Sequence, residues 1–198
     1  MRSLIVAIKM TVVLTFITGI IYPLTMTAIG YLLFPVQAGG SVIYRNGSAV
    51  GSSLIGQGFK ATRYFHSRPS SAGTNGYDPT SSGGSNLGST SKSLIDSIKQ
   101  RVKDIEEENP GVQASQIPVD MVTASGSGLD PEISPAAADL QVERIAKTRG
   151  MSEDSLRSLI EAHTRSRDAG LLGEPGVNVL ELNLALDAQA GNQPTALK

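Results

Sequence analysis

The strongest hydrophobic pattern in the chain is a continuous apolar segment near its N-terminus. No charged residue occurs between Lys9 and Arg45, and the residues from Met10 to Phe34 are mostly apolar. As a helix this segment would span about 37 Å, against a hydrocarbon core of roughly 30 Å in a typical bilayer. The pattern predicts a short N-terminus (residues 1–9), one transmembrane helix (residues 10–34) and one polar domain (residues 35–198).

A cleaved signal peptide is the alternative explanation of this segment. Val36, Gln37 and Ala38, ahead of Gly39, resemble a small-residue cleavage site. However, the apolar part of a signal peptide is usually only about 7 to 15 residues long. A retained anchor that crosses the membrane once is therefore favoured.

The charges beside the segment predict its orientation. Arg2 and Lys9 lie on its N-terminal side, whereas the first ten residues after Phe34 carry no charge. Positively charged flanks tend to stay in the cytoplasm. We therefore expect a cytoplasmic N-terminus and a C-terminal domain outside.

One face of the expected helix carries a stripe of hydroxyl groups beside Gly19. The stripe follows from spacings of four and three residues, which return to the same side of a helix. Its members are Thr11, Thr15, Thr18, Tyr22 and Thr25. Such a face suits packing against other membrane helices, although a threonine in a lipid-facing helix can also bond the carbonyl four residues earlier. Pro23 is expected to kink the helix.

The rest of the chain alternates between strand and helix signals, which predicts an α+β domain of mixed α/β character. Asn-Gly between two short apolar runs predicts a hairpin over residues 41–51. Apolar periodicity with Ser or Thr caps predicts helices over residues 90–108, 135–149 and 152–163. Four leucines that alternate with other residues predict a strand over residues 180–187.

The Gly/Ser-rich stretch of residues 52–91 carries four aromatic residues, which a featureless flexible linker would lack. They are Phe59, Tyr64, Phe65 and Tyr77. We expect this stretch to be an ordered loop packed on the domain.

Composition and motifs exclude several function classes. The chain has no cysteine, so a disulfide framework and a cysteine nucleophile are excluded. Its net charge of −1 leaves no basic footprint for nucleic acid. No segment has the spacing of a P-loop, and His66 and His163 do not sit in a metal-binding spacing, so no metal is expected.

A Ser-x-x-Lys motif offers an alternative function. Ser89 and Lys92 match the pattern in which an amine activates a nucleophilic serine. No Ser-Asp-Asn or Lys-Thr-Gly motif follows it, and the match coincides with a helix start, where Ser and Thr are favoured as caps. A membrane-anchored envelope serine hydrolase using Ser89 and Lys92 is the alternative.

Two further groups of residues could bind ions. Lys60, Arg63, Arg68 and the stretch Ser81 to Ser85 could hold an anion, as in a stand-alone anchored binding module. Asp130-Pro131-Glu132 could supply oxygen ligands to a cation. Ordinary surface charge and a tight turn ahead of a helix are the favoured interpretations of the two groups.

Several segments, taken in order, resemble one known family. They are Tyr22-Pro23-Leu24, Gly51 to Gln57, Tyr64 to Pro69, Ser82 to Gly88, Ala124 to Pro131, Ile133-Ser134-Pro135, Gln141, Gly173-Glu174-Pro175 and Val177 to Asn183. With these segments the chain strongly resembles KdpC, the C subunit of the Kdp potassium-transporting ATPase, over almost its whole length.

The resemblance implies an accessory, noncatalytic subunit of a high-affinity potassium uptake complex in the bacterial inner membrane. Its partners would be a channel-like subunit that selects potassium, a P-type ATPase subunit that hydrolyses ATP, a small single-helix subunit and the lipid bilayer. Potassium would be handled by a partner rather than by this chain. The hydroxyl stripe would then face the channel-like subunit.

The family is also described as a catalytic chaperone that raises the affinity of the ATPase subunit for ATP. The proposed nucleotide contacts would fall on Ser82, Gly83, Gly84 and Gln141, with ATP as the ligand and no firmly bound cofactor. This role conflicts with the orientation expected from the charges, because an external domain cannot reach cytoplasmic ATP. A domain on the potassium-entry side that stabilises the channel-like subunit or shapes ion access agrees with that orientation.

Overall fold

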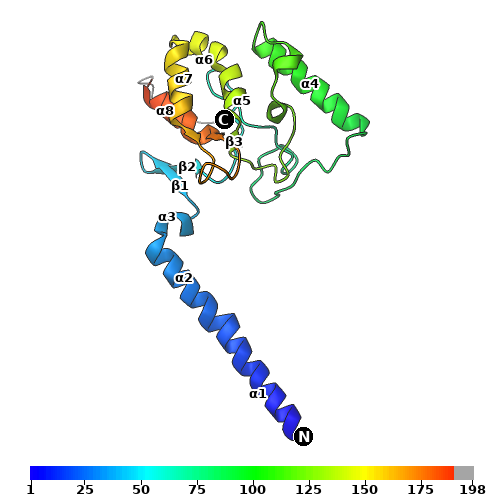
Figure 1. Cartoon of the computed structure of the whole chain (residues 1–198), viewed down its shortest axis with the longest axis vertical. Helices are drawn as coiled ribbons and strands as arrows, with labels where there is room; N and C mark the ends of the chain where they lie inside the picture. The colour runs from blue at the N-terminus through cyan, green and yellow to red at the C-terminus, as the bar shows by residue number, and fades with distance from the viewer. Residues whose placement is uncertain (190–198) are drawn as a thin grey trace. The chain divides into compact units, whose positions relative to one another are not determined.

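The computed structural model of the chain describes residues 1–189. The chain divides into two compact units, Met1–Ser52 and Ser53–Lys198, and each is described here by itself (Figure 1). The fold class is the predicted one, since one long apolar helix near the N-terminus accompanies a region of mixed helices and strands. The hairpin that the sequence assigned to the polar domain is grouped with the helix in the first unit.

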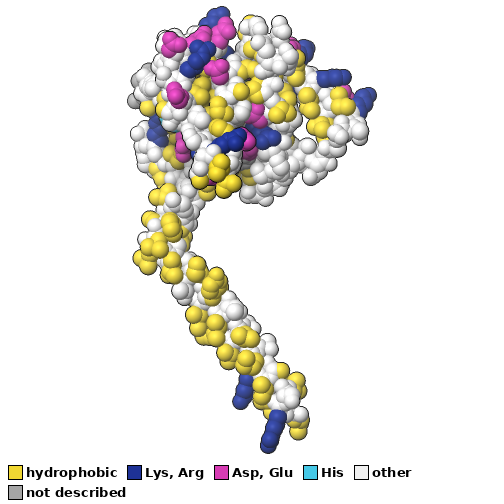
Figure 2. All heavy atoms as spheres, viewed as in Figure 1, with side chains coloured by type: hydrophobic (Ala, Val, Ile, Leu, Met, Phe, Trp, Pro, Cys, Tyr) yellow, Lys and Arg dark blue, Asp and Glu magenta, His cyan; other side chains and the backbone are white. Residues whose placement is uncertain are grey.

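The first unit begins with an almost continuous helix made of α1 (Arg2–Phe16), a π-helical turn (Ile17–Ile21) and α2 (Tyr22–Leu33). The short helix α3 (Pro35–Ala38) follows. The stretch Arg2–Leu33 is long and apolar enough to cross a membrane, and Figure 2 shows hydrophobic side chains along it, with Lys and Arg side chains near its N-terminal end. The helix extends beyond the predicted span because Lys9 limits an apolar segment without interrupting a helix.

The predicted disturbance at Pro23 takes the form of the π-helical turn. Proline has no N–H group, so the carbonyl of Gly19 lacks the donor that it would have in a regular helix. The π-helical turn Ile17–Ile21 contains this position. A π-bulge is one of the recognised causes of a helix kink, and it lies here in the turn before the proline.

The predicted hairpin is confirmed. Strands β1 (Val42–Arg45) and β2 (Ser48–Ser52) pair antiparallel, with a bulge between Ile43 and Tyr44. The two turn residues, Asn46 and Gly47, have φ values of 51° and 79°. Positive φ at both central residues is the requirement of a type I′ turn, which explains why Asn-Gly located the hairpin in the sequence.

The second unit combines helices with a small antiparallel sheet of strand order β3-β5-β4. The strands are β3 (Glu132–Ile133), β4 (Thr164–Arg165) and β5 (Gly176–Asn178). The helices are α4 (Lys92–Glu108), α5 (Pro135–Leu140), α6 (Val142–Arg149), α7 (Glu153–Ala162) and α8 (Val179–Gln189), with two 3₁₀ turns at Ala114–Gln116 and Val119–Met121. In Figure 1, α5 to α8 gather at one side of the unit and α4 lies at the other.

The local helix signals correctly located four helices of this unit, α4 to α7. The Ser134 hydroxyl caps α5 by accepting a hydrogen bond from Ala137 N at 3.1 Å, and Ser152 caps α7 in the same way. Gly150 ends α6 with a φ of 66°, as expected for a left-handed C-terminal residue. The helix predicted over residues 135–149 is divided into α5 and α6 at Gln141.

The strand predicted over residues 180–187 is wrong, because these residues form α8. The alternation of leucines imitates a strand, but α8 is buried on most sides, so no polar face reveals its helical period. Leu182 and Leu186 are fully buried, and so is the polar Asn183 beside them, at 2% exposure. Asn178 marks the start of this helix, because Asn is a favoured N-cap residue. Its side chain accepts a hydrogen bond from Glu181 N at 3.1 Å.

The Gly/Ser-rich stretch is an ordered loop packed on the domain, as predicted. Phe59, Tyr64 and Phe65 are all buried, and Phe65 has no exposed surface. The core that receives them is formed by apolar side chains of α6, α7, α8 and β5, among them Ile145, Leu156, Leu182, Leu186 and Val177. The stretch therefore contributes core residues although it contains no helix or strand beyond the end of β2.

Candidate functional site

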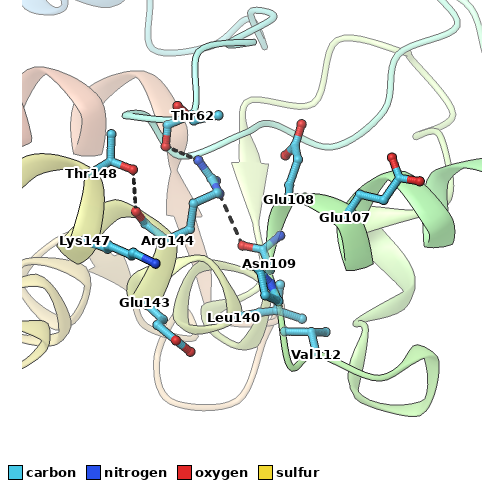
Figure 3. Close-up of a pocket in the computed structure, with 11 residues that line it drawn as sticks. Thr62, Glu107, Glu108, Asn109, Val112, Leu140, Glu143, Arg144, Lys147 and Thr148 are labelled. Atoms are coloured by element: carbon cyan, nitrogen blue, oxygen red, sulfur yellow. Dashed lines mark hydrogen bonds between the residues drawn. The ribbon is translucent and has the colours of Figure 1, made fainter.

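A pocket of about 320 Å³ lies between the C-terminal end of α4 and helix α6 (Figure 3). Its lining comes from residues 107–112, residues 140–148 and Thr62. The charged members carry both signs: Glu107 and Glu108 come from α4, and α6 supplies Glu143, Arg144 and Lys147. The pocket is therefore not a simple anion or cation site, and its organisation depends on how these charges are held.

Arg144 joins three segments at the wall of the pocket. Its Nε donates to Asn109 Oδ1 at 3.2 Å, at the end of α4. Its Nη1 donates to the backbone carbonyls of Thr62 and Tyr64, and its Nη2 donates to Gln141 Oε1 at 2.8 Å. Burial lowers the pKa of Arg144, and Glu108 partly opposes that change. The guanidinium group therefore ties α4 and the loop of residues 62–66 to α6.

His66 makes the second connection between this loop and α4. Its Nδ1 lies 3.2 Å from the carboxylate of Glu108, and its Nε2 lies 3.2 Å from the carbonyl oxygen of Ala61. Burial and the positive charge of Arg144 lower the pKa of His66, and Glu108 and the Ala61 carbonyl oppose the change. Both ring nitrogens face acceptors, Glu108 and the Ala61 carbonyl, which favour the charged form of the ring. Burial and the charge of Arg144 disfavour that form.

Gln141, at the junction of α5 and α6, forms hydrogen bonds with the backbone of His66. Its Oε1 accepts from His66 N at 2.7 Å, and its Nε2 donates to His66 O at 3.3 Å and to Ala137 O at 3.0 Å. The side chain is fully buried. One amide group thus satisfies both backbone polar groups of His66, as a neighbouring strand would.

Asn183 of α8 does the same for the preceding residue. Its Oδ1 accepts from Phe65 N at 2.9 Å, and its Nδ2 donates to Phe65 O at 3.0 Å. The two amides, from α8 and from the junction of α5 and α6, hold consecutive residues of a loop that has no strand partner. The position of residues 65–66 is therefore fixed by side chains rather than by a sheet.

A buried ion pair fixes the residue before them. Tyr64 donates from its hydroxyl to Asp187 Oδ2 at 3.0 Å, and Arg149 Nη2 lies 2.8 Å from Asp187 Oδ1. The Arg149 guanidinium carbon lies 4.9 Å from the centre of the Tyr64 ring. Burial and the hydrogen bond to Asp187 raise the pKa of the Tyr64 hydroxyl. The sequence Tyr64-Phe65-His66 is thus held along its whole length by α6 and α8.

The Ser-Gly-Gly stretch packs against a different loop. Gly83 N donates to Ser127 O at 2.8 Å, and the Ser82 hydroxyl donates to the same carbonyl at 3.0 Å. A Cβ atom on Gly84 would lie 3.1 Å from Gly126 O. The two Gly/Ser-rich loops therefore need glycine because their backbones touch.

The four residues for which the resemblance implied nucleotide contact have separate neighbours. Gln141 bonds to His66, Ala137 and Arg144, whereas Ser82 and Gly83 bond to Ser127. The amide of Gln141 is already occupied by protein groups. Nucleotide contact at Ser82, Gly83, Gly84 and Gln141 stays a prediction, and ATP stays an expected ligand only through the resemblance.

Three of the charged residues considered for ion sites, Arg68, Asp130 and Glu132, form ion pairs within the protein. Arg68 lies 3.1 Å from Asp130 Oδ2 and also donates to Thr123 O at 3.1 Å. Asp130 Oδ1 accepts from Glu132 N at 3.1 Å, which confirms the turn interpretation of Asp130-Pro131-Glu132. Within residues 1–189 no group of three or more His, Cys, Asp or Glu side chains is arranged to hold a metal ion.

The Ser-x-x-Lys motif occupies the start of α4. Ser89 lies in the turn before the helix and Lys92 is its first residue, and both are exposed. The part of the chain that the structure describes has no hydrogen bond between the two side chains. The motif therefore behaves as a helix start, and the serine hydrolase alternative gains no support.

The hydroxyl stripe is exposed over its full length in the first unit. Thr11, Thr15, Thr18, Gly19, Tyr22 and Thr25 all have exposed side chains or surfaces. The hydroxyls of Thr18 and Thr25 donate to Leu14 O and Ile21 O, each at 2.8 Å. These two hydroxyls are thus satisfied within the helix, and the partner-facing role of the stripe stays a prediction.

Sequence reasoning missed the residues that organise the site, namely Arg144, Asn183, Arg149 and Asp187. One signal was present in the sequence. Asn183 and Asp187 are four residues apart in a leucine-rich segment, so a helical interpretation would have placed both on one face among apolar neighbours. Polar residues in such a position need buried partners.

Comparison with known proteins matches the chain to one family. Residues 4–188 match the KdpC family, described as the K⁺-transporting ATPase, c chain. The chain is 54% identical over 193 residues to the potassium-transporting ATPase KdpC subunit of Rhodopseudomonas palustris (strain BisB5). The alignment covers 92% of this chain and 94% of that relative. It is 52% identical over 193 residues to the KdpC subunit of Koribacter versatilis (98% and 96% covered) and 52% identical over 195 residues to that of Gemmatimonas aurantiaca (98% and 97% covered).

Proposed function

The chain belongs to the KdpC family of potassium-transporting ATPase subunits, and from this premise we propose that it is an accessory, noncatalytic subunit that assembles and stabilises the transport complex. The observation that carries the proposal is the match over residues 4–188, which includes the apolar helix as well as the domain. ATP hydrolysis and potassium binding are assigned to partner subunits.

The proposed partners are the channel-like potassium-selecting subunit, the P-type ATPase subunit, the small single-helix subunit and the surrounding bilayer. The stripe from Thr11 to Thr25 is proposed to pack against the channel-like subunit. Small and hydroxyl-bearing residues let helix backbones approach closely in a membrane. Gly19 lies on the stripe, and a Cβ atom built on it would meet Thr15 Cγ2 at 4.0 Å, an ordinary van der Waals distance. A partner helix could therefore approach at this point.

The domain is proposed to lie outside the inner membrane, on the potassium-entry side. Arg2 and Lys9 support this orientation because both lie in the N-terminal part of the apolar helix, and no charged residue follows Lys9 before Arg45. From that side the domain can stabilise the channel-like subunit or shape ion access. The effect on ATP affinity that the resemblance implies would then travel through helix contacts in the membrane rather than through nucleotide at Ser82 or Gln141.

Assembly through the stripe is tested with threonine substitutions on two faces of one helix. A Thr15→Leu/Thr18→Leu chain is produced together with the other subunits, and the complex is purified in mild detergent through a tag on the channel-like subunit. The amount of this chain recovered is expected to fall severalfold. Thr27→Leu is the matched control, because Thr27 lies away from the stripe by helical spacing. Equal recovery of all three proteins would contradict assembly through the stripe.

A further inference from the structure

The π-helical turn in the membrane helix leaves one backbone carbonyl without a helical donor. In a regular α-helix Thr18 O would accept from Tyr22 N, but Tyr22 N donates to Ile17 O instead. The following residue, which would be the donor in a π-helix, is Pro23, and proline has no N–H group. The carbonyl oxygen of Thr18 therefore has neither of the two helical donors.

This carbonyl lies deep in the expected membrane span. Thr18 follows Lys9 by nine residues, which places it about 14 Å along the helix from that charge. The hydrocarbon core of a bilayer is roughly 30 Å thick. Thr18 O thus lies near the middle of the core, where lipid chains donate no hydrogen bond and an unpaired backbone group is strongly unfavourable.

The helix cannot satisfy Thr18 O with its own side chains. Ser and Thr hydroxyls donate to carbonyls three or four residues earlier, as those of Thr18 and Thr25 do to Leu14 O and Ile21 O. A hydroxyl that reached Thr18 O in this way would stand at position 21 or 22, and these positions hold Ile and Tyr. Isoleucine has no donor, and tyrosine carries its hydroxyl at the far end of the ring. The donor must therefore come from outside the helix.

The surface beside the carbonyl is open to such a donor. Residues 17–25 are all exposed in the structure. The residue after Thr18 is Gly19, which has no side chain and on which a Cβ atom would meet Thr15 Cγ2 only at 4.0 Å. Small residues let a second membrane helix approach closely, so a side chain of such a helix can reach this part of the backbone.

The composition of the span favours a neutral donor over a cation. No charged residue lies between Lys9 and Arg45, so a Lys or Arg side chain facing Thr18 would find no carboxylate on this helix. Charged side chains near the bilayer centre are costly and usually paired. Amide and hydroxyl side chains donate without a charge, and they form hydrogen bonds between membrane helices.

We propose that a membrane helix of the transport complex presents an Asn, Gln, Ser or Thr side chain that donates a hydrogen bond to Thr18 O. This inference rests on the proposed function, which supplies a membrane helix beside the hydroxyl stripe. It adds the chemical group that the facing helix carries. A hydrogen bond to one particular carbonyl also fixes the depth and rotation at which the two helices meet, which close packing of small residues alone does not.

Pro23→Ala tests whether the unpaired carbonyl is recognised. Alanine at this position supplies an N–H group and allows a regular helix, in which Tyr22 N pairs with Thr18 O. The variant and the unmodified chain, with different epitope tags, are produced together with the other subunits. Their ratio in the purified complex is compared with their ratio in the membrane. We expect the variant to be under-represented by roughly 3- to 30-fold, as for loss of one hydrogen bond between membrane helices.

Pro35→Ala is the matched control. Pro35 is the first residue of α3, a position at which a proline removes no helical hydrogen bond. This variant should enter the complex as often as the unmodified chain. Equal incorporation of Pro23→Ala and the unmodified chain would overturn the proposal.

Disulfide mapping identifies the facing group. The chain has no cysteine, so Thr18→Cys introduces a single thiol, and single cysteines are scanned through the membrane helices of the other subunits. We expect the positions that form a disulfide with Thr18→Cys to lie within one helical turn of an Asn, Gln, Ser or Thr side chain. Only apolar side chains around those positions would overturn the proposal.

Replacement of the identified donor by Leu completes the test. This change should exclude the unmodified chain by about the same factor as Pro23→Ala, and the two changes together should have no larger effect than either alone. A proline that acts only through the shape of the helix predicts no effect of the donor substitution on the unmodified chain. That result, or two effects that multiply, would overturn the proposal.

The two proposals fail in different ways. If the unmodified chain does not purify with the other subunits, the proposed function itself is wrong. If the unmodified chain purifies with them and Pro23→Ala does so equally well, only the hydrogen bond to Thr18 O is wrong.

Discussion

The side-chain amide of Asn183 makes two hydrogen bonds with the backbone of Phe65. Asn183 Oδ1 accepts from Phe65 N at 2.9 Å, and Asn183 Nδ2 donates to Phe65 O at 3.0 Å. These residues are 118 positions apart in the sequence. The side-chain amide of Gln141 makes the same pair of hydrogen bonds with the backbone of His66. Together the two side chains replace the missing strand beside the loop, and the stability of the domain should depend on them.

Replacement of Asn183 by Leu should therefore strongly destabilise the protein. The change leaves the buried N–H and C=O of Phe65 without partners, at a cost of about 2 to 5 kcal/mol in the free energy of unfolding. Urea unfolding of the full-length chain in detergent measures it. Gln100→Leu is the control, because Gln100 is an exposed amide on α4 and its substitution should change stability by less than about 0.5 kcal/mol. Similar stabilities of the two variants would contradict the bracing role of Asn183.

The contact between the two Gly/Ser-rich loops predicts a difference between neighbouring glycines. Gly128 has a φ of 68°, and a Cβ atom on it would lie 2.5 Å from Gly83 O and 2.7 Å from Ala72 N. Gly128→Ala should lower the free energy of unfolding by more than about 2 kcal/mol, since the backbone must move. Gly126→Ala is the matched control, because a Cβ atom there would meet nothing within 4 Å. If both variants unfold at the same denaturant concentration, the tight loop contact is not formed.

His66 predicts a dependence of stability on pH. Burial and Arg144 lower its pKa in the folded protein below the ordinary value of 6.5. The unfolded chain therefore binds the proton more readily, so the stabilisation is complete above about pH 6.5 and is lost as pH falls toward the folded pKa. His66→Gln should remove this part of the pH dependence, as measured by thermal unfolding between neutral and mildly acid pH.

The second histidine provides the control for that experiment. His163 lies at the end of α7, with Nδ1 2.9 Å from Leu159 O and no carboxylate partner among its described contacts. His163→Gln therefore controls for the loss of an imidazole side chain as such. An unchanged pH profile in His66→Gln would contradict the contribution assigned to His66.

The placement of the domain also predicts the behaviour of the Ser-Gly-Gly stretch. If the domain is outside the membrane, Ser82→Ala should leave the KM of the purified complex for ATP unchanged within about 2-fold, because the Ser82 hydroxyl only supports the contact with Ser127. ATPase activity at a range of ATP concentrations measures this. A large rise in KM with normal assembly would support direct nucleotide contact and contradict the external placement.

Local signals explain which parts of the fold could be predicted from the sequence. Asn46-Gly47, Ser134, Ser152 and Gly150 each specify a turn or a helix end through their own backbone preferences, and each was located correctly. The segment α8 was mistaken for a strand because it is buried on most sides and its leucines happen to alternate. Burial on all sides removes the contrast between faces from which a period is read.

The candidate site could not be predicted because its contacts join distant parts of the sequence. Arg144 bonds to Thr62, Tyr64 and Asn109, which lie between 35 and 82 residues away. No residue spacing in the sequence predicts these contacts of Arg144. The groups meet only because α6 packs beside the loop of residues 62–66 and the end of α4. The family resemblance supplied the identity of the subunit but not these contacts.

The sidedness of the domain tests the central claim most directly. The sequence has no cysteine, so single cysteines can be introduced at Ser3 and at the exposed Thr90 and labelled with a membrane-impermeant maleimide. Our account predicts that Thr90→Cys is labelled in intact spheroplasts and Ser3→Cys only in inverted vesicles. Labelling of Thr90→Cys in inverted vesicles but not in spheroplasts would place the domain in the cytoplasm and contradict the account.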